Sequence, residues 1–215
     1  MNDIFRPHLR QYVLIFFDDI LVYNRTWEEH LGHLRTVLDL LRQHKLKAKD
    51  SKCLWGQQRV DNLGHIIYKD GVEADPNKIQ SMVDWSLPKT TKELRGFLGL
   101  IGYYRRFIVN YGKVVAPLTA LLRKGAFSWM DKAREEFEAL KKAMISASVL
   151  GLAAFTKSFT SLCDASGVDV GALLMQEDRP VAYMSKALSK RSQLLSTYER
   201  EILAIIHAIT KGDAS

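Results

Sequence analysis

The chain has 215 residues, of which 47% are hydrophobic and 26% are charged. This composition is typical of a soluble globular protein and excludes a disordered tail, a collagen-like fibre and a disulfide scaffold. No apolar run reaches the ~20 residues that span a bilayer and no secretory leader is visible, so we expect no membrane partner. Cys53 and Cys163 stand far apart, in no metal-binding spacing, which favours a reduced, intracellular location in the cytoplasm or nucleus.

The net charge of +7 is concentrated in the middle of the chain. Residues 69–128 contain ten Lys and Arg against five Asp and Glu, an excess of +5, whereas residues 1–68 carry +2 and residues 129–215 are neutral. A basic segment between two nearly neutral ones suits an acidic partner, with nucleic acid the first to consider. A merely soluble surface is the alternative, and on charge alone the two interpretations are nearly even.

The N-terminal residues predict a hairpin with acidic side chains at its tip. Residues 12–17, rich in β-branched and aromatic side chains, predict a buried strand, and residues 20–23 predict a second one. Asp18 and Asp19 join the two. Adjacent carboxylates behind a buried strand are costly unless a cation neutralises them, and Mg²⁺ is bound by one or two carboxylates together with substrate phosphates. A solvated acidic turn is the alternative for the pair taken alone.

Two further elements follow before the basic segment. Thr26 and Glu29 predict a capping box, and leucines then recur at the spacing of an amphipathic helix. Residues 63–68 predict a strand, which a tight turn at residues 69–71 joins to a second strand beginning near Val72.

The basic segment is predicted to be helical. Asp75 and Pro76 begin one helix, and Thr90 with Glu93 begins another. The second helix has an apolar stripe that comprises Leu94, Phe97, Leu98, Ile101 and Tyr104. It also has a glycine at every third position, an unfavourable choice inside a helix, at Gly96, Gly99 and Gly102. We expect these glycines to let another backbone approach, with helix packing favoured over contact with a nucleic-acid backbone, and the two roles are compatible.

The C-terminal third predicts a helix, three strands and a last helix. Ser128 and Asp131 predict the start of the first helix, and strands are expected at residues 159–163, 170–175 and 180–185. In the first strand, Phe159 and Leu162 are expected to be buried. Ser196 and Glu199 predict the cap of the last helix, whose buried face is expected to comprise Ile202, Ile205, Ile206 and Ile209.

Several of these segments resemble one family. Residues 12–23 resemble the catalytic palm hairpin of reverse transcriptases, and residues 63–66 resemble the hairpin that grips the primer strand. Residues 93–99 and 102–108 resemble the thumb of gypsy-type LTR retrotransposon polyproteins. Residues 163–166 and 198–204 resemble the opening of the RNase H domain of these polyproteins. The motifs agree in order and spacing, and the resemblance runs from residue 1 to about residue 211.

The resemblance implies an α+β fold in three parts. Residues 1–72 correspond to the C-terminal part of the palm with its hairpin. Residues 73–127 correspond to the helical thumb or connection. Residues 128–215 correspond to the start of an RNase H-like domain, with a partial mixed sheet and a helix. The final residues, 211–215, depart from the aromatic continuation of the family.

The resemblance also assigns the site residues. Asp18 and Asp19 match the aspartate pair that holds two Mg²⁺ ions for nucleotidyl transfer, and Asp164 and Glu201 match carboxylates that bind two metal ions for hydrolysis of the RNA strand. The residues expected to contact nucleic acid are Gly64, His65, Arg95, Arg105 and Arg106. The implied partners are an RNA template, a DNA primer, an RNA–DNA hybrid, deoxynucleotides and the remainder of a polyprotein.

Further ligands that the family uses have no match in this chain. Its polymerase site takes another aspartate from an upstream strand, and its RNase H site takes two later aspartates. We therefore expect both active sites to be incomplete and the chain to be inactive alone, as a fragment of an RNA-directed DNA polymerase with RNase H. The alternative is a non-catalytic, nucleic-acid-binding relic that uses its basic thumb.

Overall fold

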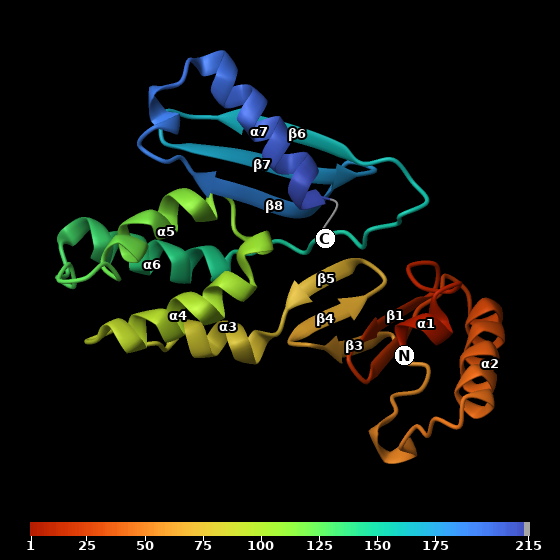
Figure 1. Cartoon of the computed structure of the whole chain (residues 1–215). Coiled ribbons are helices and arrows are strands. Elements are labelled where there is room, and N and C mark those ends of the chain that lie inside the picture. Colours follow the sequence, from red (N-terminus) through yellow and green to blue (C-terminus); the bar gives the residue numbers. More distant parts are fainter. Residues whose placement is uncertain (213–215) are drawn as a thin grey trace. The chain divides into compact units, whose positions relative to one another are not determined.

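A computed structural model describes residues 1–212 of the chain (Figure 1). The chain divides into two compact units, each described by itself. The first comprises residues 1–57 with residues 154–157, and the second comprises residues 58–153 with the chain from residue 158 onward. Helices and three small sheets confirm the predicted α+β class. No helix in this part of the chain has the length and apolar character needed to cross a membrane. The predicted departure at residues 211–215 lies outside the residues whose side chains are described.

The first unit is built on a two-stranded hairpin. Strands β1 (Val13–Phe16) and β2 (Asp19–Val22) pair antiparallel, with Phe16 opposite Asp19. Helices α1 (Asn2–Phe5) and α2 (Trp27–Gln43) and the short helix η1 (Asp50–Lys52) complete it. The Thr26 hydroxyl accepts a hydrogen bond from the Glu29 amide, as the capping box predicts.

The prediction of a fully buried first strand is wrong. Val13 is buried, whereas the side chains of Leu14 and Phe16 are 40% and 51% exposed. Side chains alternate between the two faces of a strand, and only one face of β1 contributes to the core of this unit. That core comprises Phe5, Tyr12, Val13, Val37 and Leu41.

The second unit begins with a three-stranded antiparallel sheet. It contains β3 (Arg59–Asn62), β4 (His65–Tyr68) and β5 (Gly71–Ala74). Strand β3 was not predicted, because its sequence is polar and its Arg59 and Asp61 side chains are exposed. Leu63 and Gly64, expected to begin a strand, instead form the turn between β3 and β4.

Four helices follow the sheet: α3 (Pro76–Val83), α4 (Thr91–Tyr103), α5 (Tyr111–Ala120) and α6 (Asp131–Ile145). The short helix η2 (Arg105–Phe107) lies between α4 and α5. The Asp75 and Thr90 side chains cap α3 and α4 as predicted. The predicted cap at Ser128 is wrong, because α6 starts after Met130 without a side-chain cap. The expected stripe of α4 is confirmed at Leu94, Phe97, Ile101 and Tyr104, which lie in a core shared with α6.

The chain continues into a second antiparallel sheet covered by a helix. The sheet contains β6 (Thr160–Ala165), β7 (Asp169–Gln176) and β8 (Arg179–Ala187). The short helix η3 (Ser192–Leu194) then leads to α7 (Thr197–Gly212), which lies over one face of the sheet (Figure 1). All pairings are antiparallel, so the mixed sheet implied by the resemblance is not seen within the described strands.

The buried face of α7 differs from the prediction. Ala204 and Ala208 are 1% and 4% exposed, whereas the four isoleucines expected in the core are 40–62% exposed: Ile202, Ile205, Ile206 and Ile209. The small alanines let the helix lie close to the sheet, which leaves the bulky isoleucines on its other side. Phe159 and Leu162, also expected to be buried, are 37% and 55% exposed in the described chain.

Candidate active site and nucleic-acid interface

The turn between β1 and β2 carries the aspartate pair. Asp18 lies in the two-residue turn, and Asp19 is the first residue of β2. Phe17 supplies the left-handed conformation of the turn, with φ of 54°. Both aspartates are exposed, and neither side chain forms an ion pair or hydrogen bond among the described residues. The turn therefore presents two neighbouring carboxylates to a ligand from outside.

The donor set at this turn fits Mg²⁺ only in part. Carboxylate oxygens are the ligands that Mg²⁺ prefers, and one or two suffice when water and substrate phosphates complete its shell. Within residues 1–212, no group of three or more His, Cys, Asp and Glu side chains is placed to hold a metal ion. The pair thus supplies a partial site that needs other ligands.

The turn between β3 and β4 is held from the end of α4. Leu63 and Gly64 both have left-handed backbones, with φ of 54° and 73°. The Tyr103 hydroxyl donates to the Leu63 carbonyl over 2.7 Å, and the Tyr104 hydroxyl donates to the Gly64 carbonyl over 2.8 Å. A Cβ atom on Gly64 would lie 2.7 Å from the Tyr104 hydroxyl oxygen, so only glycine fits there.

His65 lies in the same aromatic cluster. Its ring stacks on Tyr103, with centroids 5.2 Å apart and planes 7° apart, and meets Tyr104 edge to face at 5.3 Å. Burial, assisted by the positive charge of Arg106, lowers the pKa of His65 to about 4, so the ring is neutral at pH 7. Burial raises the pKa of Tyr104 to about 12, so its hydroxyl remains a donor. The sequence interpretation singled out Gly64, His65 and Arg106 but missed the two tyrosines.

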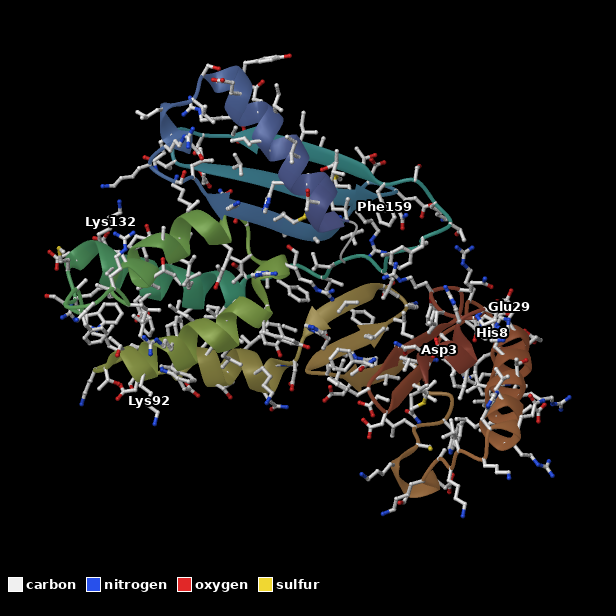
Figure 2. All side chains as sticks on the ribbon, in the orientation of Figure 1. Asp3, His8, Glu29, Lys92, Lys132 and Phe159 are labelled. Carbon is white, nitrogen blue, oxygen red and sulfur yellow. The ribbon has the colours of Figure 1, made fainter. Side chains whose placement is uncertain are left out.

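One exposed face of α4 carries basic side chains and two glycines. Lys92, labelled in Figure 2, is exposed near the start of the helix, and Arg95, Gly96, Gly99 and Tyr103 are also exposed. Arg105 and Arg106, in the short helix η2 that follows, are exposed as well. The arginines expected to contact nucleic acid are therefore all accessible.

The predicted role of the glycines in helix packing is wrong. A Cβ atom at Gly99 would have no neighbour within 4 Å, one at Gly96 would meet only the Trp85 ring, and one at Gly102 would meet the Tyr111 hydroxyl at 3.1 Å. None of the three faces another backbone. Gly99 instead leaves a flat place on the exposed face of α4.

Asp164 and Glu201 occupy two packed elements. Asp164 lies on β6 opposite Gly171, Glu201 lies on α7, and both side chains are exposed. Helix α7 packs against β6 and β7, but no hydrogen bond joins the two carboxylates. Glu199 accepts hydrogen bonds from Ser196, which lower its pKa and confirm it as the capping residue.

Arg200 and Asp169 are further polar residues of this region that the sequence interpretation missed. A guanidinium nitrogen of Arg200 lies 3.4 Å from the position of a Cβ atom on Gly167, so the side chain reaches the turn after β6. Asp169 is 6% exposed and is bound by the Ser166 hydroxyl. No local spacing in the sequence indicates that Arg200 reaches a turn so much earlier in the chain.

Comparison with known families covers both ends of the chain. Residues 1–67 match the reverse transcriptase (RNA-dependent DNA polymerase) family, and residues 129–213 match the RNase H-like domain found in reverse transcriptase. The retrovirus-related Pol polyprotein from transposon 297 of Drosophila melanogaster is 37% identical over 210 residues, which are 97% of this chain and 20% of that polyprotein. The polyprotein from transposon gypsy of the same organism is 30% identical over 98% of this chain and 22% of its own length.

A shorter relative and two solved structures complete the comparison. A mitochondrial protein of Arabidopsis thaliana, described as uncharacterized, is 51% identical over 124 residues, covering 57% of this chain and 78% of that protein. The foamy viral protease–reverse transcriptase in complex with an RNA/DNA hybrid aligns with a TM-score of 0.85, at 21% identity, over 98% of this chain and 29% of that chain. The same enzyme in complex with double-stranded DNA aligns with a TM-score of 0.84, at 21% identity, over 99% of this chain and 45% of that chain. These two show the fold alone.

The matched segments define a reverse transcriptase joined to an RNase H-like domain. Because the similarity to transposon polyproteins runs along nearly the whole chain, the chain belongs to the Pol polyproteins of LTR retrotransposons, as the sequence motifs predict. It spans about a fifth of the length of the Drosophila polyproteins that it matches.

Proposed function

We propose that this chain contributes palm, thumb and RNase H-like segments to a retrotransposon polymerase that copies RNA into DNA and hydrolyses the RNA of the hybrid. The palm segment is residues 1–72, the thumb or connection 73–127, and the RNase H-like segment 128–215. The observation that carries the proposal is the exposed, unpaired aspartate pair at the β1–β2 turn, inside the segment that matches reverse transcriptases.

Asp18 and Asp19 are the proposed ligands of the polymerase site, and Asp164 and Glu201 those of the RNase H site. Mg²⁺, two ions in each complete site, would lower the pKa of the attacking hydroxyl and neutralise charge on the phosphate. The chain's own part is to carry two exposed carboxylates at the tip of a short hairpin, one on β6 and one on α7. Each proposed site has two carboxylates, so we expect the chain alone to bind Mg²⁺ weakly and to extend no primer.

The nucleic-acid partner is proposed to lie along the exposed face of α4 and the β3–β4 turn. Arg95, Arg105 and Arg106 would contact phosphates, which fix position rather than sequence. Gly64 and His65 would lie beside the primer strand. Two features support this path: the open position at Gly99 and the excess of +5 in residues 69–128.

A non-catalytic binding module is the second candidate function. It is favoured by the absence, within residues 1–212, of any three-residue cluster that could hold a metal. Such a module would keep the basic face and bind a hybrid without chemistry.

The test combines binding and primer extension by the 215-residue chain. We expect a labelled RNA–DNA hybrid to bind, with an affinity that falls steeply as salt rises. Replacing Arg105→Glu together with Arg106→Glu should weaken binding by more than tenfold. The matched control is Lys132→Glu with Arg134→Glu, an equal charge change on exposed residues of α6, of which Figure 2 labels Lys132.

Binding that ignores salt, or an equal loss in the control variant, would contradict the proposed interface. Nucleotide incorporation on a primed RNA template with Mg²⁺, abolished by Asp18→Asn, would contradict the expectation that the chain is inactive alone. An assay of the longer polyprotein, with and without Asp18→Asn, distinguishes the polymerase from the non-catalytic module.

A further inference from the structure

The turn between β3 and β4 has both of its carbonyl oxygens fixed inside the protein. The Leu63 carbonyl accepts from the Tyr103 hydroxyl, and the Gly64 carbonyl accepts from the Tyr104 hydroxyl and, over 3.0 Å, from the Asp75 amide. In the described residues, no hydrogen bond has the amide of Leu63 or Gly64 as its donor. The peptide between Leu63 and Gly64 therefore has its carbonyl oxygen bound by Tyr103, while its N–H, that of Gly64, has no hydrogen-bond partner among the described residues and remains for a ligand.

We propose that Tyr103 and Tyr104 are positioning residues that hold these carbonyls inward, so that the turn's amides can donate to a phosphodiester of the bound nucleic-acid strand. The inference rests on the proposed function, which places Gly64 beside nucleic acid. A carbonyl oxygen turned toward a phosphate would repel it, whereas an amide N–H bonded to an anion forms one of the stronger hydrogen bonds in proteins.

The surroundings of the turn suit an anionic ligand. Arg105 and Arg106 are exposed in η2, directly after the two tyrosines. The acidic residues whose charges act on this cluster are Asp61 and Asp75. Asp75 is 7% exposed and its carboxylate accepts the Asn77 amide as the cap of α3, which leaves Asp61 as the exposed acidic neighbour.

The two tyrosines differ in a way that makes the inference testable. Tyr104 is 1% exposed, so loss of its hydroxyl also affects the core. Tyr103 is 52% exposed, and a phenylalanine in its place keeps the stack on His65 while it removes only the hydrogen bond to Leu63. Tyr103→Phe should therefore release the Leu63 carbonyl of the turn with little effect on the free energy of unfolding.

The experiment measures the anisotropy of a fluorescein-labelled RNA–DNA hybrid with the 215-residue chain over a series of KCl concentrations. We expect Tyr103→Phe to weaken binding about five- to tenfold, which is less than the full value of one hydrogen bond to a charged group because the Tyr104 hydroxyl still holds the turn. The double variant Tyr103→Phe/Tyr104→Phe should weaken binding further and leave the slope of log affinity against log salt unchanged, because a backbone amide carries no charge and its contact with a phosphate releases no counterion. The matched control is Tyr68→Phe, which removes a hydroxyl bonded to Glu73 at the other end of β4.

The outcomes separate this inference from the proposed function. If the unaltered chain shows no salt-dependent binding, the proposed function and the inference both fail. If it binds and the tyrosine variants match it in affinity and slope, only the inference fails. A loss of affinity with a lower slope also overturns the inference, because the variants would then have displaced basic side chains such as Arg105 and Arg106. A loss that tracks a loss of folded structure, in circular dichroism and urea unfolding of each variant, overturns it as well, because the tyrosines would then act only through folding.

Discussion

Two hairpin turns of this chain share a backbone conformation but differ in what supports them. In the β1–β2 turn Phe17 is left-handed, with φ of 54°, and its side chain is 83% exposed. In the β3–β4 turn Leu63 has the same φ, but two tyrosine hydroxyls and a backbone amide bind the turn carbonyls. The first turn leaves its side chains exposed to solvent, whereas hydrogen bonds from other residues fix the backbone of the second.

The difference follows from what each turn presents. A left-handed non-glycine residue costs about 1–2 kcal/mol, so each turn needs compensation. At the first turn the Phe16 and Phe17 rings meet edge to face at 4.8 Å, which supports the backbone without covering Asp18 and Asp19. At the second, the backbone itself is the proposed contact, and the hydrogen bonds from α4 fix it. We infer that carboxylate ligands need an open turn, whereas a backbone contact needs a rigid one.

Gly64→Ala should produce the largest effect, because it breaks the fixed turn. The added Cβ would be strained at φ of 73° and would displace the buried Tyr104 hydroxyl, at a combined cost of about 3 kcal/mol in the free energy of unfolding. Urea unfolding followed by circular dichroism measures it. The control is Gly125→Ala, which has φ of 74° and no neighbour within 4 Å, and should cost only about 1 kcal/mol.

A second substitution separates the clash from the backbone strain. Tyr104→Phe removes the clashing oxygen, and the ring carbon that carried it lies 3.9 Å from the new Cβ, an ordinary contact. The double variant Gly64→Ala/Tyr104→Phe should therefore be more stable than the sum of the single effects by about 1 kcal/mol or more. Additive effects would show that the tyrosine does not constrain the turn.

The next effect in size concerns pH, through His65. Its folded pKa of about 4 lies below the value of 6.5 for a free histidine, so the unfolded chain binds more protons between these pH values. The stability contribution is complete above pH 6.5 and is lost as the pH falls toward 4. We expect the chain to lose about 1 kcal/mol more than the His65→Phe variant between pH 7.5 and 5, after allowance for the partial exposure of the ring. Urea unfolding at both pH values measures this, and equal losses would contradict the assignment.

Short-range signals made parts of this fold predictable. The caps at Thr26, Asp75, Thr90 and Ser196 depend on contacts two or three residues apart, and all four are present. The aspartate pair was found for the same reason, since an apolar strand on each side of two acidic residues is a local pattern. The stripe of α4 was found from its spacing.

Contacts between distant residues could not be predicted in this way. Tyr103 and Tyr104 bind carbonyls 40 residues earlier in the chain, and nothing in the spacing of the two segments indicates it. The isoleucines of α7 have the right periodicity for a buried face, but the neighbouring alanines are the residues that face the sheet. Hydrophobic spacing predicted that α7 is amphipathic, but it did not predict which side is covered.

The smallest expected effect tests the open turn. Asp18→Asn with Asp19→Asn should change the free energy of unfolding by less than about 0.5 kcal/mol, because both side chains are exposed and unpaired in the described chain. If the pair binds Mg²⁺ weakly, 10 mM Mg²⁺ should stabilise the unaltered chain by about 0.5 kcal/mol and the variant by less. Thermal unfolding with and without the metal measures both.

A second pair of adjacent carboxylates in the same unit provides the control for this effect. Glu28 and Glu29 are exposed in the first turn of α2, and Figure 2 labels Glu29. Glu28→Gln with Glu29→Gln removes the same charge as the aspartate variant. Stabilisation by Mg²⁺ should survive in the glutamine variant and disappear in the asparagine variant. Loss in both would mean that the metal only screens acidic charge. The β1–β2 turn would then be a solvated acidic turn, and the proposed assignment of Asp18 and Asp19 as metal ligands would lose its support.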